Sequence, residues 1–156
     1  MNSTVLLAFG IGFVAGLRSL TAPAAVACAA YLGWINLQHS PLAFMASKWA
    51  VIILTILAVA ELIADQLPST PPRTRVLGLS ARIATGGLSG ACLAAAGSAS
   101  IGWGAIAGIA GGIAGAFGGY YARVGLVRSL RVPDFAIALP EDGIAIGLGL
   151  FLASRL

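Results

Sequence analysis

Long apolar stretches follow one another along almost the whole chain, and this feature most limits what the chain can fold into. A helix needs about 20 consecutive apolar residues to cross the hydrocarbon core of a bilayer. Of the 156 residues, 59% are hydrophobic and only 9% are charged, a composition far from that of soluble domains. We therefore expect residues 1–156 to form a single integral membrane domain, an all-α, polytopic transmembrane helix bundle of five or six membrane segments.

The charge balance and the cysteines argue against several classes of function. The net charge is +4, but no basic patch is interleaved with aromatic residues, so nucleic acid is not an expected partner. Cys28 and Cys92 lie in separate apolar stretches without a second ligand nearby, which fits neither a zinc site nor a redox pair. With His39 as the single histidine, no nucleophile, base and metal-ligand set can be assembled. We expect no enzyme, no metal site and no cofactor.

Basic residues are concentrated in two segments, and these set the expected orientation. Residues 68–81 carry Arg73 and Arg75, with Arg82 just beyond, and residues 122–134 carry three further arginines. The positive-inside rule places such segments in the cytoplasm. Two spans expected between them, at about residues 80–96 and 101–121, return the chain to the same side. We therefore expect loops 68–81 and 122–134 to be cytoplasmic and the C-terminus to lie outside.

Two of the apolar stretches contain helix-breaking signals. Residues 18–23 combine hydroxyl side chains with Pro23, which predicts a break and two short pieces at about residues 5–17 and 22–35. These pieces form either one kinked crossing or two short helices that turn within the membrane. Pro140, directly before two acids, is typical of a helix start and predicts a second break within residues 135–152. Residues 42–67 form the clearest single span.

Four carboxylates lie inside these apolar stretches and are the first candidates for function. An acid at the centre of a spanning helix costs roughly 2.5–3.5 kcal/mol on insertion scales, so it usually faces a bundle interior or a water-filled cavity and takes a partner. Two of the acids are four residues apart and share one helix face. Arg82 is expected in the same half of the bilayer as the acids, and Arg18 joins them if the first stretch makes a hairpin. The predicted ion-binding set is therefore Glu61, Asp65, Glu141, Asp142, Arg18 and Arg82.

Two functions remain open for this set. The first is a small membrane transporter or channel in which the acid and arginine cluster binds a cation or a proton, with broken helices supplying free backbone carbonyl groups. The second is a non-transporting structural or lipid-interacting membrane protein whose buried charges only hold the helices together, since paired charges also satisfy the cost of burial. Membrane lipids are expected partners in both cases.

Glycines at helical spacing predict close contacts between helices. Residues 86–119 contain twelve glycines. Small residues at every fourth position let helix backbones approach closely in a membrane, where burial of apolar side chains gives no advantage. Two such faces on one helix predict an intramolecular partner and a homo-oligomer, through one face or the other: Gly104, Gly108 and Gly112, or Gly111, Gly115 and Gly119.

Four short motifs point to a known family. They are Gly16-Leu17-Arg18, Asp65-x-Leu67-Pro68-x-x-Pro71-x-Arg73-Thr74, Gly111-Gly112-x-x-Gly115 and Glu141-Asp142. Together they resemble a family of small bacterial inner-membrane proteins catalogued only as a domain of unknown function. The resemblance extends over nearly the whole chain, although this chain has Gln66 where the family is expected to carry lysine. It implies an all-helical fold and a place in the bacterial inner membrane, and it supplies no activity.

Overall fold

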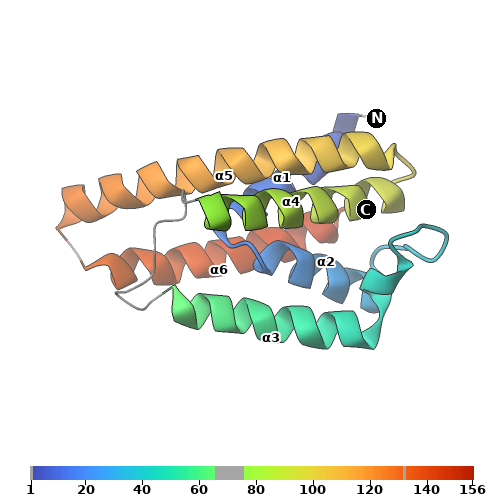
Figure 1. Ribbon diagram of the computed structural model, residues 1–156, viewed down its shortest axis with the longest axis horizontal. Coiled ribbons are helices and arrows are strands. Elements are labelled where there is room, and N and C mark those ends of the chain that lie inside the picture. The colour runs from blue at the N-terminus through green and yellow to red at the C-terminus, as the bar shows by residue number, and fades with distance from the viewer. Residues whose placement is uncertain (1, 66–75, 132) are drawn as a thin grey trace.

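The computed structural model describes residues 2–65, 76–131 and 133–156, and within these ranges all regular secondary structure is helical. The predicted all-α class is therefore confirmed. Figure 1 shows most of the helices running lengthwise beside one another along the long axis of the molecule. In chain order the elements are α1 (Asn2–Leu17), α2 (Thr21–Tyr31), the short 3-10 helix η1 (Ala43–Ala46), α3 (Lys48–Ala64), α4 (Val76–Ala96), α5 (Ile101–Leu130) and α6 (Asp134–Ala153).

Three of the helices in the described ranges, α4, α5 and α6, are long and apolar enough to cross a membrane. Helices α1 and α2 are shorter apolar helices. Helix α3 has 17 residues, which at 1.5 Å per residue is about 26 Å, somewhat less than the roughly 30 Å of a bilayer core. It begins later than the span predicted from residue 42 because Ser47 caps it, its Oγ accepting from the Ala50 amide at 3.1 Å.

The predicted break after Leu17 is confirmed, and it produces a helical hairpin. Helix α2 runs back toward the end of the molecule at which both chain termini lie (Figure 1), so the two pieces do not form one kinked crossing. Helix α1 packs mainly against α4 and α5, whereas α2 packs against α3 and α6. Gly16 lies against Gly112 and Ala116, so the hairpin tip, residues 18–20, follows directly after a contact with the middle of α5.

Three predicted boundaries are wrong. Residues 76–81, expected in a loop, belong to α4, while residues 66–75 of that loop lie outside the described residues. Residues 122–130, also expected in a loop, continue α5 to Leu130, because this segment holds no proline before Pro133. Pro140 lies inside a continuous α6. A membrane helix tolerates an internal proline when neighbouring groups satisfy the backbone that it leaves unpaired.

The glycines join α1, α4 and α5 through their backbones. A Cβ atom added at Gly108 would lie 2.1 Å from the carbonyl oxygen of Gly86 in α4, and one added at Gly111 would lie 2.0 Å from that of Phe9 in α1. Both glycine-rich sides of α5 are thus covered within one chain, and the predicted homo-oligomer stays a prediction that would need another surface. We call these contacts the glycine seam: Gly12, Gly16, Gly86, Gly90, Gly104, Gly108, Gly111, Gly112 and Gly115.

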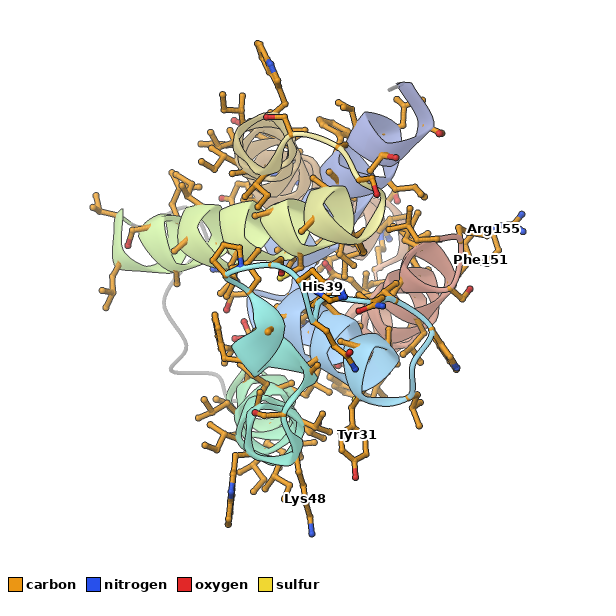
Figure 2. All side chains as sticks on the ribbon, turned by 90° about the vertical axis from the view of Figure 1, so that its right-hand side faces the viewer. Tyr31, His39, Lys48, Phe151 and Arg155 are labelled. Atoms are coloured by element: carbon orange, nitrogen blue, oxygen red, sulfur yellow. The ribbon has the colours of Figure 1, made fainter. Side chains whose placement is uncertain are left out.

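At the end of the molecule that carries both termini, aromatic side chains and isolated charged side chains are exposed. Trp34, Trp49 and Trp103 are exposed there, as expected for side chains at a membrane interface. Figure 2 looks onto this end and shows Lys48 and Arg155 at the periphery, pointing away from the bundle. The arrangement differs from that at the hairpin tip, where charged side chains are buried.

Candidate functional site

Arg18 is the centre of a charged cluster at the hairpin tip. Its side chain is 0% exposed. Its Nη1 pairs with Asp65 Oδ2, and its Nη2 lies 2.5 Å from Asp142 Oδ1. Asp65 is the C-cap residue of α3 and Asp142 lies in α6, so one guanidinium joins the hairpin to two other helices.

Glu61 accepts three hydrogen bonds from the hairpin tip. The Ser19 amide and hydroxyl donate to Oε1 at 2.9 and 2.6 Å, and the Leu20 amide donates to Oε2 at 2.8 Å. Leu20 is the N-cap residue of α2 and offers no side-chain cap. Glu61 from α3 therefore supplies the carboxylate that the N-terminal end of a helix favours, because its amides are unpaired there and its dipole is positive.

Arg82 contacts the other helix that ends at the tip. It is 5% exposed, its Nε donates to the Gly16 carbonyl at 3.0 Å, and its Nη1 donates to the Gly78 carbonyl at 2.9 Å. The Gly16 carbonyl belongs to the last turn of α1, where carbonyl groups lack helical partners and the dipole is negative. The cation thus lies at the end of α1 and the carboxylate of Glu61 at the start of α2, each where the helix dipole favours it.

Five of the six predicted site residues therefore surround the hairpin tip, and we call them the tip cluster: Arg18, Glu61, Asp65, Arg82 and Asp142. They come from α3 and its C-cap, from α4, from α6 and from the tip itself. The sequence separates them by up to 124 positions, so only the packing of α3, α4 and α6 around the hairpin brings them together.

The sixth predicted residue, Glu141, lies outside this cluster. Its Oε2 is 3.6 Å from Nη1 of Arg123 in α5, a residue that the sequence indicated only as a marker of orientation. A signal for this pair was present in the sequence. Arg123 and Glu141 lie nine positions on either side of residue 132, and antiparallel helices joined by a short connection bring such equidistant positions together.

Sequence reasoning also missed three backbone groups and one hydroxyl at the tip. Ser19 donates through both its amide and its Oγ, the Leu20 amide donates to Glu61, and the Gly16 carbonyl accepts from Arg82. The hydroxyl-rich segment was read as a cap signal for its own helix. The structure instead uses it to bind an acid from another helix, which no local pattern indicates.

A groove lies between α5 and α6 and ends beside the tip cluster. It has a volume of about 340 Å³, and its lining includes Leu17 and Glu141, the direct chain neighbours of Arg18 and Asp142. The side chains of Asp65 and Asp142 are 14% and 10% exposed. These two carboxylates are therefore largely buried but remain partly accessible to solvent.

Some polar atoms at the tip have no protein partner. Within the described part of the chain, Arg18 Nε and Thr21 Oγ1 are buried without a hydrogen bond. Buried polar atoms of this kind are sites at which ordered water binds in proteins. No group of three His, Cys, Asp or Glu side chains in the described ranges is placed to hold a metal ion. At the tip, two carboxylates share one guanidinium.

The comparisons with known proteins agree with the resemblance carried by the four motifs. A family model described as a domain of unknown function, DUF4126, matches residues 5–154. No curated protein and no solved structure matches the chain. The matched range includes nearly the whole hairpin, the glycine seam and every residue of the tip cluster, and the chain belongs to the DUF4126 family.

Proposed function

We propose that the protein is a small membrane transporter or channel in which the tip cluster takes up and releases a proton. One observation carries the proposal: the fully buried guanidinium of Arg18 is shared by two carboxylates, Asp65 and Asp142. At and beside the tip, three arginines face four carboxylates. If all seven are ionised, one negative charge is in excess, and excess buried charge is unfavourable.

A proton relieves this excess more simply than a metal cation does. Arg18 already lies against both aspartates, so a metal ion would have to displace the guanidinium. Protonation of one aspartate leaves Arg18 paired with the other. A small movement of the guanidinium between the two carboxylates would then change which of them holds the proton, and intramembrane acids in such networks commonly serve as proton relays.

The remaining architecture gives this cluster a place in a membrane. Helices α4, α5 and α6 are long and apolar enough to span a membrane, and we propose that they do so and that α3 and the α1–α2 hairpin are also embedded, which gives six segments. Described arginines gather toward the end of the molecule where α5 finishes, namely Arg82, Arg123, Arg128 and Arg131. By the positive-inside rule we place this end on the cytoplasmic side of a bacterial inner membrane.

Proton movement in proteoliposomes tests the proposal. The purified protein is reconstituted with a pH-sensitive dye inside the vesicles, and a pH gradient is imposed with and without a panel of small solutes. We expect the wild-type protein to dissipate the gradient, alone or with one class of solute. Asp142→Asn should abolish this movement, whereas Arg155→Gln, at the opposite end of the molecule, should leave it unchanged. Wild-type vesicles that stay as tight as empty ones with every solute would contradict the proposal.

A second candidate function is a structural membrane protein, and one observation favours it. Each of the four carboxylates already contacts a donor or a cation: Arg18 for Asp65 and Asp142, the hairpin amides for Glu61, and Arg123 for Glu141. The variant Arg18→Gln/Asp142→Asn separates the two candidates. If the protein is a transporter, the wild type moves protons and the double variant, although folded, does not. If its role is purely structural, the wild type moves no protons, and the stability lost in Arg18→Gln partly returns in the double variant.

A further inference from the structure

A second cavity lies where α1 and α5 begin, at the end of the molecule opposite the tip cluster. Its volume is about 730 Å³, within the range of small-molecule sites in proteins, roughly 300–1,000 Å³. Two segments far apart in the sequence form its walls, the first turns of α1 and the connection from α4 into α5. The lining includes Thr4, Val5 and Leu6 from the first segment and Ser98, Ser100 and Trp103 from the second.

Helices α1 and α5 run parallel, so two helix N-termini border this cavity. A Cβ atom added at Gly12 would lie 2.1 Å from the Gly108 carbonyl oxygen, and one added at Gly16 would lie 2.4 Å from that of Gly112. Both contacts join residues with the same separation in the sequence, as parallel helices require, and Figure 1 shows both helices beginning at the same end. The first amides of a helix lack helical acceptors, and its dipole is positive there.

Hydrogen-bond donors at the cavity are not used by the protein. Thr4 is only 8% exposed, it lines the cavity, and within residues 2–65, 76–131 and 133–156 its hydroxyl has no hydrogen-bond partner. Ser100, the N-cap residue of α5, makes no side-chain cap hydrogen bond, so the amides of the first turn remain available to a ligand. The cavity therefore suits a group that brings several oxygen acceptors.

No acidic side chain lies near enough to repel an anion from the cavity. Four of the five acids lie at or beside the tip cluster, and Asp134 begins α6 at the end where α5 finishes. Along α1, Gly16 at the tip is about 18 Å from Thr4, at 1.5 Å per residue. Phosphate groups bind readily at helix N-termini, where free amides and the dipole favour negative charge.

Apolar side chains at the cavity favour a phosphate that carries alkyl chains. Leu6 is 69% exposed and Trp103 is 64% exposed, and both line the cavity. An exposed tryptophan at the end of a membrane helix lies at the level of the lipid headgroups. A phosphate bound beside Thr4 and Ser100 would therefore have apolar side chains next to it on the membrane side.

We propose that this cavity binds the phosphate group of a phospholipid. The phosphate oxygens accept from the Thr4 hydroxyl, the Ser100 hydroxyl and the free amides at the start of α5, and the alkyl part of the lipid lies against Leu6 and Trp103. The proposal does not depend on proton transport, because the cavity and the tip cluster lie at opposite ends of α1.

Native mass spectrometry of the purified protein tests the site, with phosphatidylglycerol and diacylglycerol of identical acyl chains as the two probes. We expect the wild type to retain phosphatidylglycerol in preference. Thr4→Val keeps the shape of the side chain but removes its hydroxyl, and should weaken retention about tenfold, as expected for the loss of one hydrogen bond to a charged group. Thr55→Val, the same change at an exposed position of α3, is the matched control and should have no effect.

A second pair of variants tests the backbone donors. Ile101 is the first residue of α5, a position where proline fits a helix because its missing amide has no helical acceptor. The preceding Ser100, at φ −64° and ψ 120°, has the extended backbone favoured before proline. Ile101→Pro should therefore fold and weaken retention of phosphatidylglycerol several-fold, whereas Ile101→Val keeps the amide and should not.

Three outcomes would overturn the proposal. Equal retention of phosphatidylglycerol and diacylglycerol would show that the phosphate is not recognised. Retention insensitive to both Thr4→Val and Ile101→Pro would place the bound lipid elsewhere on the protein. Displacement of phosphatidylglycerol by excess inorganic phosphate would show that the cavity takes the free ion and not the lipid; we expect the lipid to stay bound.

Discussion

The glycine seam and the tip cluster hold the same hairpin by opposite means, and they meet at Gly16. In the seam, α1 approaches α5 so closely that a Cβ added at Gly16 would lie 2.4 Å from the Gly112 carbonyl oxygen. In the cluster, the carbonyl of Gly16 accepts from Arg82, and the chain continues into the buried Arg18. The seam depends on the absence of side chains, and the cluster depends on long charged ones.

The difference shows how helices associate where apolar burial gives no advantage. In lipid, association relies on van der Waals packing and on polar contacts between helices. The seam uses the first and the cluster uses the second. We therefore expect the seam to fail when atoms are added and the cluster to fail when atoms are removed, which makes the comparison testable by substitutions of opposite kind.

The largest expected effect is the loss of Arg18. Arg18→Met leaves Asp65 and Asp142 buried without their shared cation, and removing one partner of a buried ion pair typically costs about 3–5 kcal/mol. Thermal or chemical unfolding in detergent measures the loss, with exposed Arg155→Met as the control. A change in the free energy of unfolding below about 1 kcal/mol would show that the cluster does not hold the hairpin.

A smaller but clear effect is expected from one added methyl group in the seam. Gly108→Ala places a Cβ 2.1 Å from the Gly86 carbonyl oxygen, and overpacking of this kind costs about 1–3 kcal/mol. Gly147→Ala is the matched control, because nothing lies within 4 Å of an added Cβ there. Its effect should stay within about 0.5 kcal/mol. Equal melting of the two variants would mean that α4 and α5 can separate freely.

The smallest expected effect concerns the cap that α3 gives to α2. Glu61→Gln keeps one carbonyl acceptor but loses the negative charge beside the Ser19 and Leu20 amides. Loss of a cap and of its interaction with the helix dipole costs about 1 kcal/mol. Hydrogen exchange should become faster at the Leu20 amide and in the first turn of α2, while α5 keeps its protection. An unchanged rate of hydrogen exchange at the Leu20 amide would show that Glu61 does not cap α2.

The sequence predicted the helices better than their ends. Apolar stretches indicated an all-α membrane chain, and the break after Leu17 was readable from residues 18–23 because hydroxyl groups and Pro23 stop one helix and start another. The same reasoning failed at Pro140, where a local breaker lies inside a continuous helix. It also failed for residues 122–130, because a cluster of arginines marks the side of the membrane but does not distinguish a loop from the end of a long helix.

The candidate site was predicted as a set of residues but not as an arrangement. The cost of burying charge singled out the four acids and two arginines, since that cost depends on residue type alone. Which charge meets which was not readable. Asp65 and Asp142 are 77 positions apart, and both reach Arg18 only because α3 packs on α2 and α6 packs on both helices of the hairpin.

By itself, the sequence determined the apolar character of the chain, the helical fold, the glycine spacing and which buried acids and arginines are candidates for a site, because these follow from composition and local periodicity. Tertiary structure alone decided that the first two helices turn back as a hairpin, that both glycine faces of α5 are used within the chain, and that Glu141 pairs with Arg123 outside the tip cluster. These outcomes depend on contacts between residues far apart in the chain, where the same local pattern fits several packings and only the packed helices select one.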